Sequence, residues 1–209
     1  MTNSEKVGVA GIPHSGFAID SSFVIHHSSF REGAFTLIEL VVVVGIVTVL
    51  TGLLLSTVGY ARKKGALARA ETEIAAIAAA CENYKADNAV YPRDNATTDT
   101  LDPRQNFDAT QAVYNNASLF LYTQLSGDSS GNRNITRKSY LTFKPNMLLP
   151  AGGSGTVTAI SDPFGNSYGY STANQADPVT PKGYNPTFDL WSTAGGTTAS
   201  DAPKWIKNW

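Results

Sequence analysis

The stretch GAFTLIELVVVVGIVTVL, residues 33–50, opens an apolar run of membrane length that holds a single carboxylate, Glu39. From Leu40 to Tyr60 the sequence contains no charged residue. At about 1.5 Å of rise per residue, a helix over that segment is roughly 30 Å long, which matches the hydrocarbon core of a bilayer. A lone segment can satisfy its backbone groups in lipid only as a helix. We therefore expect a membrane-spanning helix, despite the many valines.

This helix is expected to continue beyond the membrane. A basic cluster, Arg62–Lys64, is followed by a segment rich in Ala, Glu and Lys, which favour helices. Apolar residues recur there in steps of three and four and form one stripe, made of Leu67, Ala70, Ile74, Ile77, Cys81 and Tyr84. No proline interrupts residues 35–91. The sequence thus predicts one helix over about Phe35–Asn88, apolar all round at first and then amphipathic.

The rest of the chain predicts a small domain of mixed secondary structure. Residues 109–126 are expected to form a second helix, which Gly127 would end. Four of its apolar residues would face a core, namely Val113, Leu119, Phe120 and Leu125. Short runs typical of strands follow and alternate with turns, at 139–144, 155–160, 166–172, 185–192 and 204–208. We expect a small antiparallel sheet packed on the second half of the long helix, which is an α+β fold.

Composition argues against several classes of function. The formal net charge is −1, so no basic surface indicates nucleic acid as a partner. Cys81 is the only cysteine, which excludes an intramolecular disulfide, and we expect it on an apolar helix face. The three histidines, His14, His26 and His27, all precede the apolar run. If that leader is removed, no histidine remains for a catalytic triad or an imidazole metal site.

Two features of the apolar run call for a specific role. A carboxylate in the hydrocarbon costs about 2.5–3.5 kcal/mol on insertion scales, so Glu39 should either have a partner or lie near the interface. Gly45, Gly52 and Gly59 recur every seven residues and form a face of small residues. Such a face allows membrane helices to approach closely, although glycine is common in membrane helices in any case.

The segment FTLIE, Phe35–Glu39, resembles the processing signal of type IV pilins and of the pseudopilins of type II secretion. In that family a prepilin peptidase cuts a leader before the Phe, and the new amine is methylated. The resemblance implies a leader over residues 1–34, cleavage between Ala34 and Phe35, and N-methylation of Phe35. The family usually has Gly before the cut, whereas this chain has Ala34. Cleavage after Gly33 therefore stays open as an alternative.

Later segments resemble the major pseudopilin of type II secretion. They are DNAVYP at 87–92, DPFGNSYGY at 162–170, FDLWS at 188–192 and the final WIKNW. The resemblance implies that residues 35–60 span the bacterial inner membrane and that residues 61–209 form a pilin-like domain in the periplasm. In the family a loop near the C-terminus usually holds calcium. Asp201 matches the later of its two aspartates, but the earlier one is absent, so calcium is a possible rather than an expected cofactor.

The resemblance also implies how subunits assemble. Glu39 of one subunit would pair with the Phe35 amine of a neighbour, because two buried opposite charges offset each other's desolvation. Gly45, Gly52 and Gly59 would belong to the same assembly surface. The partners implied are other copies of the chain, minor pseudopilins, prepilin peptidase and the inner-membrane assembly platform, with the membrane as the environment before assembly. The cluster Arg62–Lys64 disagrees with this topology, since basic residues tend to stay in the cytoplasm.

The sequence leaves three classes of function to compare: a filament subunit, an anchored enzyme and a tethered binding module. A structural filament subunit is expected, either of a secretion pseudopilus that drives protein secretion or of a surface pilus. An extracellular enzyme on a signal anchor has little support, because GGSG at 152–155 lacks the spacing of a nucleophile elbow. A membrane-tethered binding module is the remaining alternative. We therefore expect no enzymatic activity and no catalytic residues.

Overall fold

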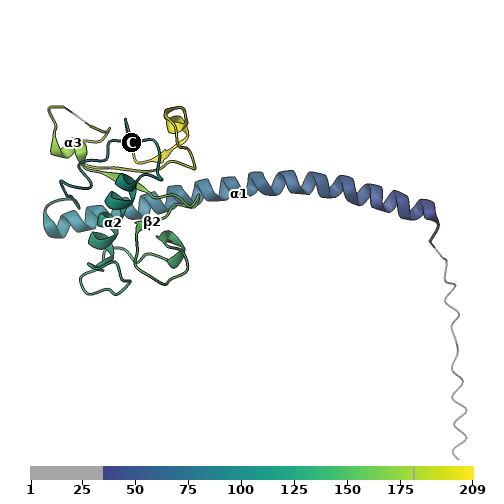
Figure 1. The fold of residues 1–209 in the computed structure, drawn as a ribbon, viewed down its shortest axis with the longest axis horizontal. Coiled ribbons are helices and arrows are strands. Elements are labelled where there is room, and N and C mark those ends of the chain that lie inside the picture. The colour runs from purple at the N-terminus through teal and green to yellow at the C-terminus, as the bar shows by residue number, and fades with distance from the viewer. Residues whose placement is uncertain (1–34, 181) are drawn as a thin grey trace, which may run out of the picture. The chain divides into compact units, whose positions relative to one another are not determined.

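A computed structural model of the chain describes residues 35–180 and 182–209 (Figure 1). The leader predicted at 1–34, with Ala34 of the predicted cleavage bond, lies outside the described residues. The described residues contain three α-helices: α1 (Leu37–Asn88), α2 (Ala112–Ser126) and the short α3 (Ala173–Ala176). Two 3₁₀ helices lie at Pro145–Met147 and Ala199–Lys204. The protein is α+β, with a long apolar N-terminal helix and small antiparallel sheets, as the sequence predicts.

The strands are short and form two sheets rather than one. In the first, β1 (Leu148–Leu149) pairs antiparallel with β2 (Ala159–Ile160). The second has the antiparallel order β3-β4-β5, where the strands are β3 (Gly169–Ser171), β4 (Asp189–Ser192) and β5 (Ile206–Lys207). Four of the five predicted strand runs thus contain a strand, each shorter than the run that predicted it.

The strand predicted at 139–144 is wrong, and β1 takes a place that the sequence did not indicate. The backbone amides of Tyr140 and Leu141 both donate to the carbonyl of Leu125, at 2.7 and 3.1 Å. This segment therefore satisfies carbonyl groups at the C-terminal end of α2 instead of joining a ladder, which is one of the ways in which helix ends are completed. The hydrogen bonds of its backbone, and not its apolar pattern alone, therefore decide that this segment is not a strand.

The second helix is confirmed, but it is rotated from the predicted orientation. Leu125 is buried, whereas Val113, Leu119 and Phe120 are only partly buried. The buried face runs instead through Tyr114, Ala117, Ser118, Leu121 and Leu125. Ser118 explains part of this rotation, since its hydroxyl accepts a hydrogen bond from the amide of Ile160 at 2.8 Å. Gly127 ends the helix in the left-handed conformation, with φ of 77°, as predicted.

The core forms around the second half of α1, where Figure 1 shows α2 and the strands gathered. Ile74, Ile77 and Cys81 of the predicted stripe are buried together with residues from α2 and β3. Tyr168 and Tyr170, which bracket Gly169 of β3, are both fully buried in this core. A smaller cluster contains Trp191 and Trp205, with Trp209 packed against it. The three tryptophans thus pack against one another near the C-terminus.

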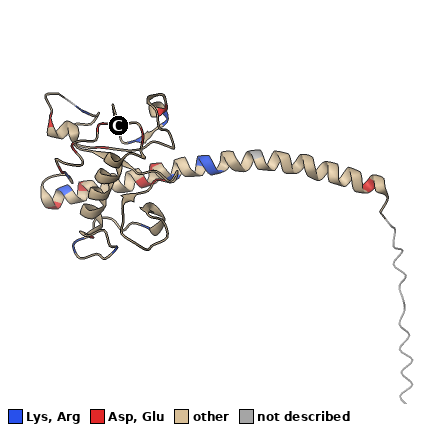
Figure 2. Cartoon of the chain, in the orientation of Figure 1, with Lys and Arg blue, Asp and Glu red and all other residues tan. Residues whose placement is uncertain are grey.

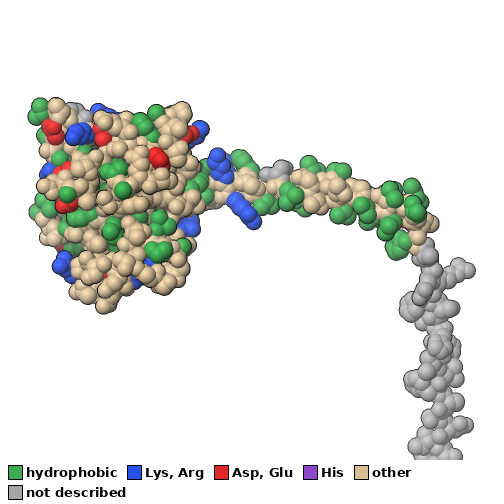
Figure 3. All heavy atoms as spheres, viewed as in Figure 1, with side chains coloured by type: hydrophobic (Ala, Val, Ile, Leu, Met, Phe, Trp, Pro, Cys, Tyr) green, Lys and Arg blue, Asp and Glu red, His purple; other side chains and the backbone are tan. Residues whose placement is uncertain are grey.

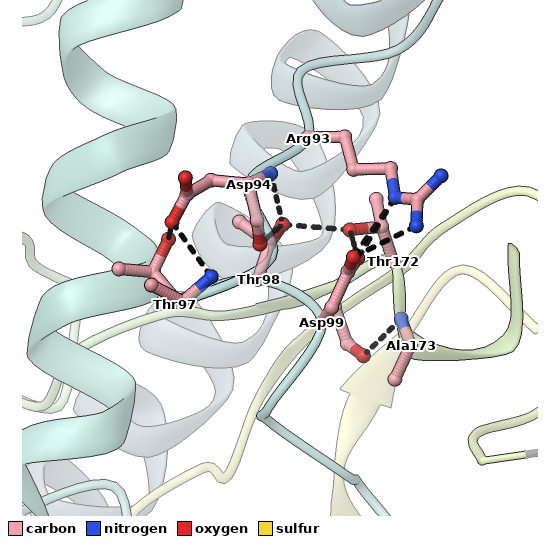
Figure 4. A network of polar contacts seen from close by, with 9 residues as sticks. Arg93, Asp94, Thr97, Thr98, Asp99, Thr172 and Ala173 are labelled. Carbon is pink, nitrogen blue, oxygen red and sulfur yellow. Dashed lines mark hydrogen bonds and ion pairs between the residues drawn. The ribbon is translucent and has the colours of Figure 1, made fainter. Parts of the chain in front are cut away.

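A polar network anchors the loop that follows α1 (Figure 4). Arg93 forms an ion pair with Asp99 at 2.9 Å. Asp99 in turn accepts a hydrogen bond from the hydroxyl of Thr172 at 2.7 Å. Thr172 also contacts the buried hydroxyl of Thr98 at 2.6 Å. The loop is therefore held against the segment that joins β3 to α3.

Candidate functional site

The first half of α1 has an apolar surface that the described residues leave uncovered. No described side chain between Phe35 and Arg69 is buried. Large residues here are widely exposed, for instance Leu37 at 79% and Leu55 at 72%. Figure 3 shows these hydrophobic side chains along the helix. Among the described residues, α1 is the one helix long and apolar enough to cross a membrane.

Glu39 completes the N-terminal end of this helix through Thr36. The carboxylate oxygen Oε2 of Glu39 accepts hydrogen bonds from the backbone amide of Thr36 at 2.9 Å and from its hydroxyl at 2.8 Å. The amide of Glu39 donates back to the Thr36 hydroxyl at 3.3 Å. This reciprocal arrangement is a capping box, which satisfies amides that lack a partner within the helix.

Thr36 is a capping residue that the sequence prediction missed. The signal was present, because Thr36-Leu-Ile-Glu39 fits the Ser/Thr-x-x-Glu pattern that precedes an apolar run. The capping box gives Glu39 a role inside its own chain, without any second subunit. It would survive cleavage at either candidate bond, since both cuts leave the amide and hydroxyl of Thr36 in place.

The other predicted assembly residues are accessible. Phe35 is 81% exposed, just before the start of α1. A Cβ atom added at Gly45, Gly52 or Gly59 would meet no atom within 4 Å. The three glycines therefore serve no close packing among the described residues, and their face is open to another helix.

A basic cluster follows the apolar surface. Figure 2 shows α1 without acidic or basic residues between Glu39 and the cluster Arg62–Lys64, apart from a small part drawn grey. All three cluster residues are exposed. The Nζ atom of Lys64 lies 5.8 Å from the centre of the Tyr60 ring. Charge thus reappears on α1 directly after its membrane-length neutral run.

Asp201, the residue matched to the calcium loop, already has partners in its own chain. Oδ2 of Asp201 accepts a hydrogen bond from the Thr198 hydroxyl at 2.7 Å, and Oδ1 contacts the ammonium of Lys204 at 3.1 Å. These contacts, with Thr198 the larger contributor, lower the pKa of Asp201 to about 2. No group of three or more His, Cys, Asp or Glu in the described chain could hold a metal ion. A lysine therefore already supplies the positive charge next to this carboxylate.

The globular part also buries carboxylates, and each has protein partners. Glu73 of α1 accepts a hydrogen bond from the Tyr168 hydroxyl at 2.8 Å and pairs with Arg69 at 2.6 Å. Asp162 accepts a hydrogen bond from the Ser192 hydroxyl at 2.5 Å, and burial raises its pKa. Burial also raises the pKa of the Cys81 thiol, so this cysteine is a core residue, as predicted. Glu73 thus connects α1 to the residue just before β3, and Asp162 connects the segment between β2 and β3 to β4.

One hollow combines aromatic and polar side chains. It has a volume of about 500 Å³ and lies at the C-terminal end of α1. Its walls include Tyr84, Phe120, Gln124, Asp94 and Gln175. The hydroxyl of Tyr84 already donates to the side chain of Gln124 at 3.0 Å. The hollow thus offers polar side chains next to aromatic rings.

No protein-family model matches this chain, no curated protein matches its sequence, and no solved structure matches its fold.

Proposed function

We propose that this chain is a structural subunit of a filament of the type II secretion pseudopilus or type IV pilus kind. It would be made with a leader that prepilin peptidase removes before Phe35. Residues 35–60 would then hold it in the bacterial inner membrane, with residues 61–209 in the periplasm. Polymerisation through the N-terminal helix would build a filament that drives protein secretion. Copies of the chain, minor pseudopilins and an assembly platform would be its partners.

The observation that carries this proposal is the uncovered apolar half of α1. A surface of this size is rare in a soluble monomer and marks an interaction with a membrane or with protein. It is continuous with the helix that organises the globular core, so the same element can serve as both an anchor and an assembly surface. The pilin-like sequence signal lies at the start of this surface, where such a signal would act.

Two features of the surface support assembly rather than anchoring alone. The open face of Gly45, Gly52 and Gly59 would let a neighbouring helix approach closely. Glu39 would pair with the amine of a neighbouring Phe35, a contact that an anchor does not need. In the isolated chain this carboxylate binds Thr36, so assembly would either exchange that partner or add the amine to it.

The first experiment is N-terminal sequencing of the protein purified from membranes. A methylated Phe35 at the N-terminus is the expected result, and it would also decide between the two candidate bonds. An intact N-terminus, or a start within the globular domain, would contradict the proposal.

A pair of substitutions at Glu39 separates assembly from helix capping. Glu39→Gln removes the charge but keeps a side chain that can complete a capping box, whereas Glu39→Ala removes both. If charge pairing drives assembly, both variants should fail to form filaments while remaining in the membrane. Filaments formed by Glu39→Gln, but not by Glu39→Ala, would assign Glu39 to capping and overturn the pairing.

The runner-up is a binding module tethered to the membrane, and the hollow beside Tyr84 and Gln124 is the observation that favours it. That function needs the anchor but not the charge at Glu39. Two results together would support this alternative. Glu39→Leu would keep full activity in a cell-surface binding assay, and electron micrographs of the wild type would show no filament. A surface pilus would instead give extracellular filaments that contain the processed chain.

A further inference from the structure

The cluster Arg62–Lys64 has no acidic partner in the part of the chain that the structure describes. The ion pairs of α1 begin only with Arg69, which bonds Glu73. The next carboxylate along the helix after the cluster is that of Glu71, seven residues beyond Lys64. At about 1.5 Å per residue this is roughly 10 Å along the axis, beyond ion-pair reach. Within residues 35–180 and 182–209, these three exposed cations therefore have no counter-charge.

The three cations spread over more than half of the helix circumference instead of occupying one face. Successive residues of an α-helix are about 100° apart, so three in a row cover roughly 200° of its circumference. One face of a partner protein could contact only part of such a collar. Tyr60, which is 67% exposed, lies just before it and contacts Lys64. An aromatic ring followed by basic residues is the pattern of a membrane–water interface.

We propose that this collar, Tyr60 with Arg62, Lys63 and Lys64, binds the phosphate groups of anionic phospholipids in the leaflet next to the globular domain. This inference rests on the proposed function, because it requires the neutral segment before Tyr60 to lie in the bilayer. Headgroups encircle a spanning helix, so they can reach cations on all sides of it. Basic residues close to a membrane surface gain favourable energy from anionic lipids.

Binding of this kind would also explain the conflict between the collar and the proposed topology. Basic residues favour the cytoplasmic side, yet the proposal places these three across the membrane. Anionic headgroups would stabilise them there and fix the depth of the helix. The globular domain would then be held at a defined height above the bilayer before assembly.

The test uses the full chain in vesicles of phosphatidylcholine with spin-labelled lipid probes. Electron paramagnetic resonance measures the fraction of each probe that the protein immobilises. For the wild type, we expect spin-labelled phosphatidylglycerol to be immobilised several-fold more strongly than spin-labelled phosphatidylcholine, and 1 M NaCl should weaken this preference. In the triple variant Arg62→Gln, Lys63→Gln, Lys64→Gln, the preference should be lost.

The matched control removes the same charge from exposed residues of the globular domain, with Arg137→Gln, Lys144→Gln and Lys182→Gln. It should keep the wild-type preference. An equal loss in the control, or a preference that survives in the collar variant, would overturn the inference. Resistance of the chain to extraction by alkaline carbonate is measured in parallel. Extraction of the wild type would contradict the membrane span itself, and hence the proposed function. A chain that stays in the membrane but shows no lipid preference would contradict only the binding of anionic lipids by the collar.

Discussion

At the scale of single residues, three carboxylates of this protein have defined partners. Glu39 binds Thr36 at the start of α1, and Glu73 binds Tyr168 and Arg69 in the core. Asp201 binds Thr198 and Lys204 near the C-terminus. Each carboxylate is satisfied by groups of its own chain, so each can be tested by removing a single partner.

Tyr168→Phe should destabilise the globular domain by about 1.5–3 kcal/mol, because a buried carboxylate would lose a charge-assisted hydrogen bond. Urea unfolding followed by circular dichroism measures this change. Tyr184→Phe serves as the control, since that ring is 47% exposed, and it should change stability by less than about 0.5 kcal/mol. Equal stability of Tyr168→Phe and the wild type would show that the bond to Glu73 contributes little.

The low pKa of Asp201 predicts a specific dependence on pH. Its folded-state pKa of about 2 lies below the ordinary value of 3.8, so its charged form is favoured in the folded state. The contribution is therefore fully present above pH 3.8 and is lost as the pH falls towards 2. Asp201→Asn should lower the melting temperature at pH 7 and lower it much less at pH 2. A difference from the wild type that is the same at both pH values would refute this linkage.

Calcium should have no effect on stability, because Lys204 already neutralises the carboxylate of Asp201. We expect the melting temperature to be the same in millimolar calcium chloride and in EDTA. If calcium raised the melting temperature of the wild type but not that of Asp201→Asn, the ion would displace Lys204. Magnesium chloride at the same concentration controls for ionic strength.

At the scale of elements, helix ends and close contacts decide where the chain turns. Gly127 ends α2 with φ of 77°, and a Cβ atom there would lie 2.5 Å from the carbonyl oxygen of Arg137. The residues after α2 pass so close because their amides bind its last carbonyls. Two separate constraints thus favour glycine at this position: the left-handed backbone conformation and the close approach of the segment at Arg137.

A comparison of two alanine substitutions separates the cost of the backbone conformation from the cost of the steric clash. Gly165 also has positive φ, at 87°, but a Cβ atom there would meet open space. Gly165→Ala should therefore cost only the left-handed backbone penalty of about 1 kcal/mol. Gly127→Ala should cost about 3 kcal/mol or more, because the clash adds to that penalty. Denaturant unfolding of the two variants checks the order, and equal costs would mean that the segment at Arg137 moves away freely.

At the scale of the whole molecule, the folding core and the apolar surface occupy different parts of α1. Buried residues of the described chain begin at Ala70, and the membrane-length neutral run ends at Tyr60. The globular domain therefore does not depend on the first half of the helix for its core. This separation is what allows the first half to serve a membrane or other subunits.

Removal of residues 1–60 should give a soluble, folded domain. Its melting temperature should lie within about 3 °C of that of the full chain in detergent, which corresponds to roughly 1 kcal/mol. The reason is that the deletion removes no buried side chain of the described residues. Aggregation, or loss of the near-ultraviolet circular dichroism signal, would show that the apolar half contributes to folding.

Local sequence was enough to predict the long helix, its neutral first half, the buried stripe with Ile74, Ile77 and Cys81, and the end of α2 at Gly127. These features depend on local periodicity, helix propensity and a single residue type. The tertiary structure decided which face of α2 is buried, where β1 forms and why residues 139–144 are not a strand. Those outcomes depend on hydrogen bonds between distant segments, such as Ser118 with Ile160 and Leu125 with Tyr140. A local pattern cannot encode such pairings, because the free energy of each depends on which backbone groups the rest of the fold leaves unpaired.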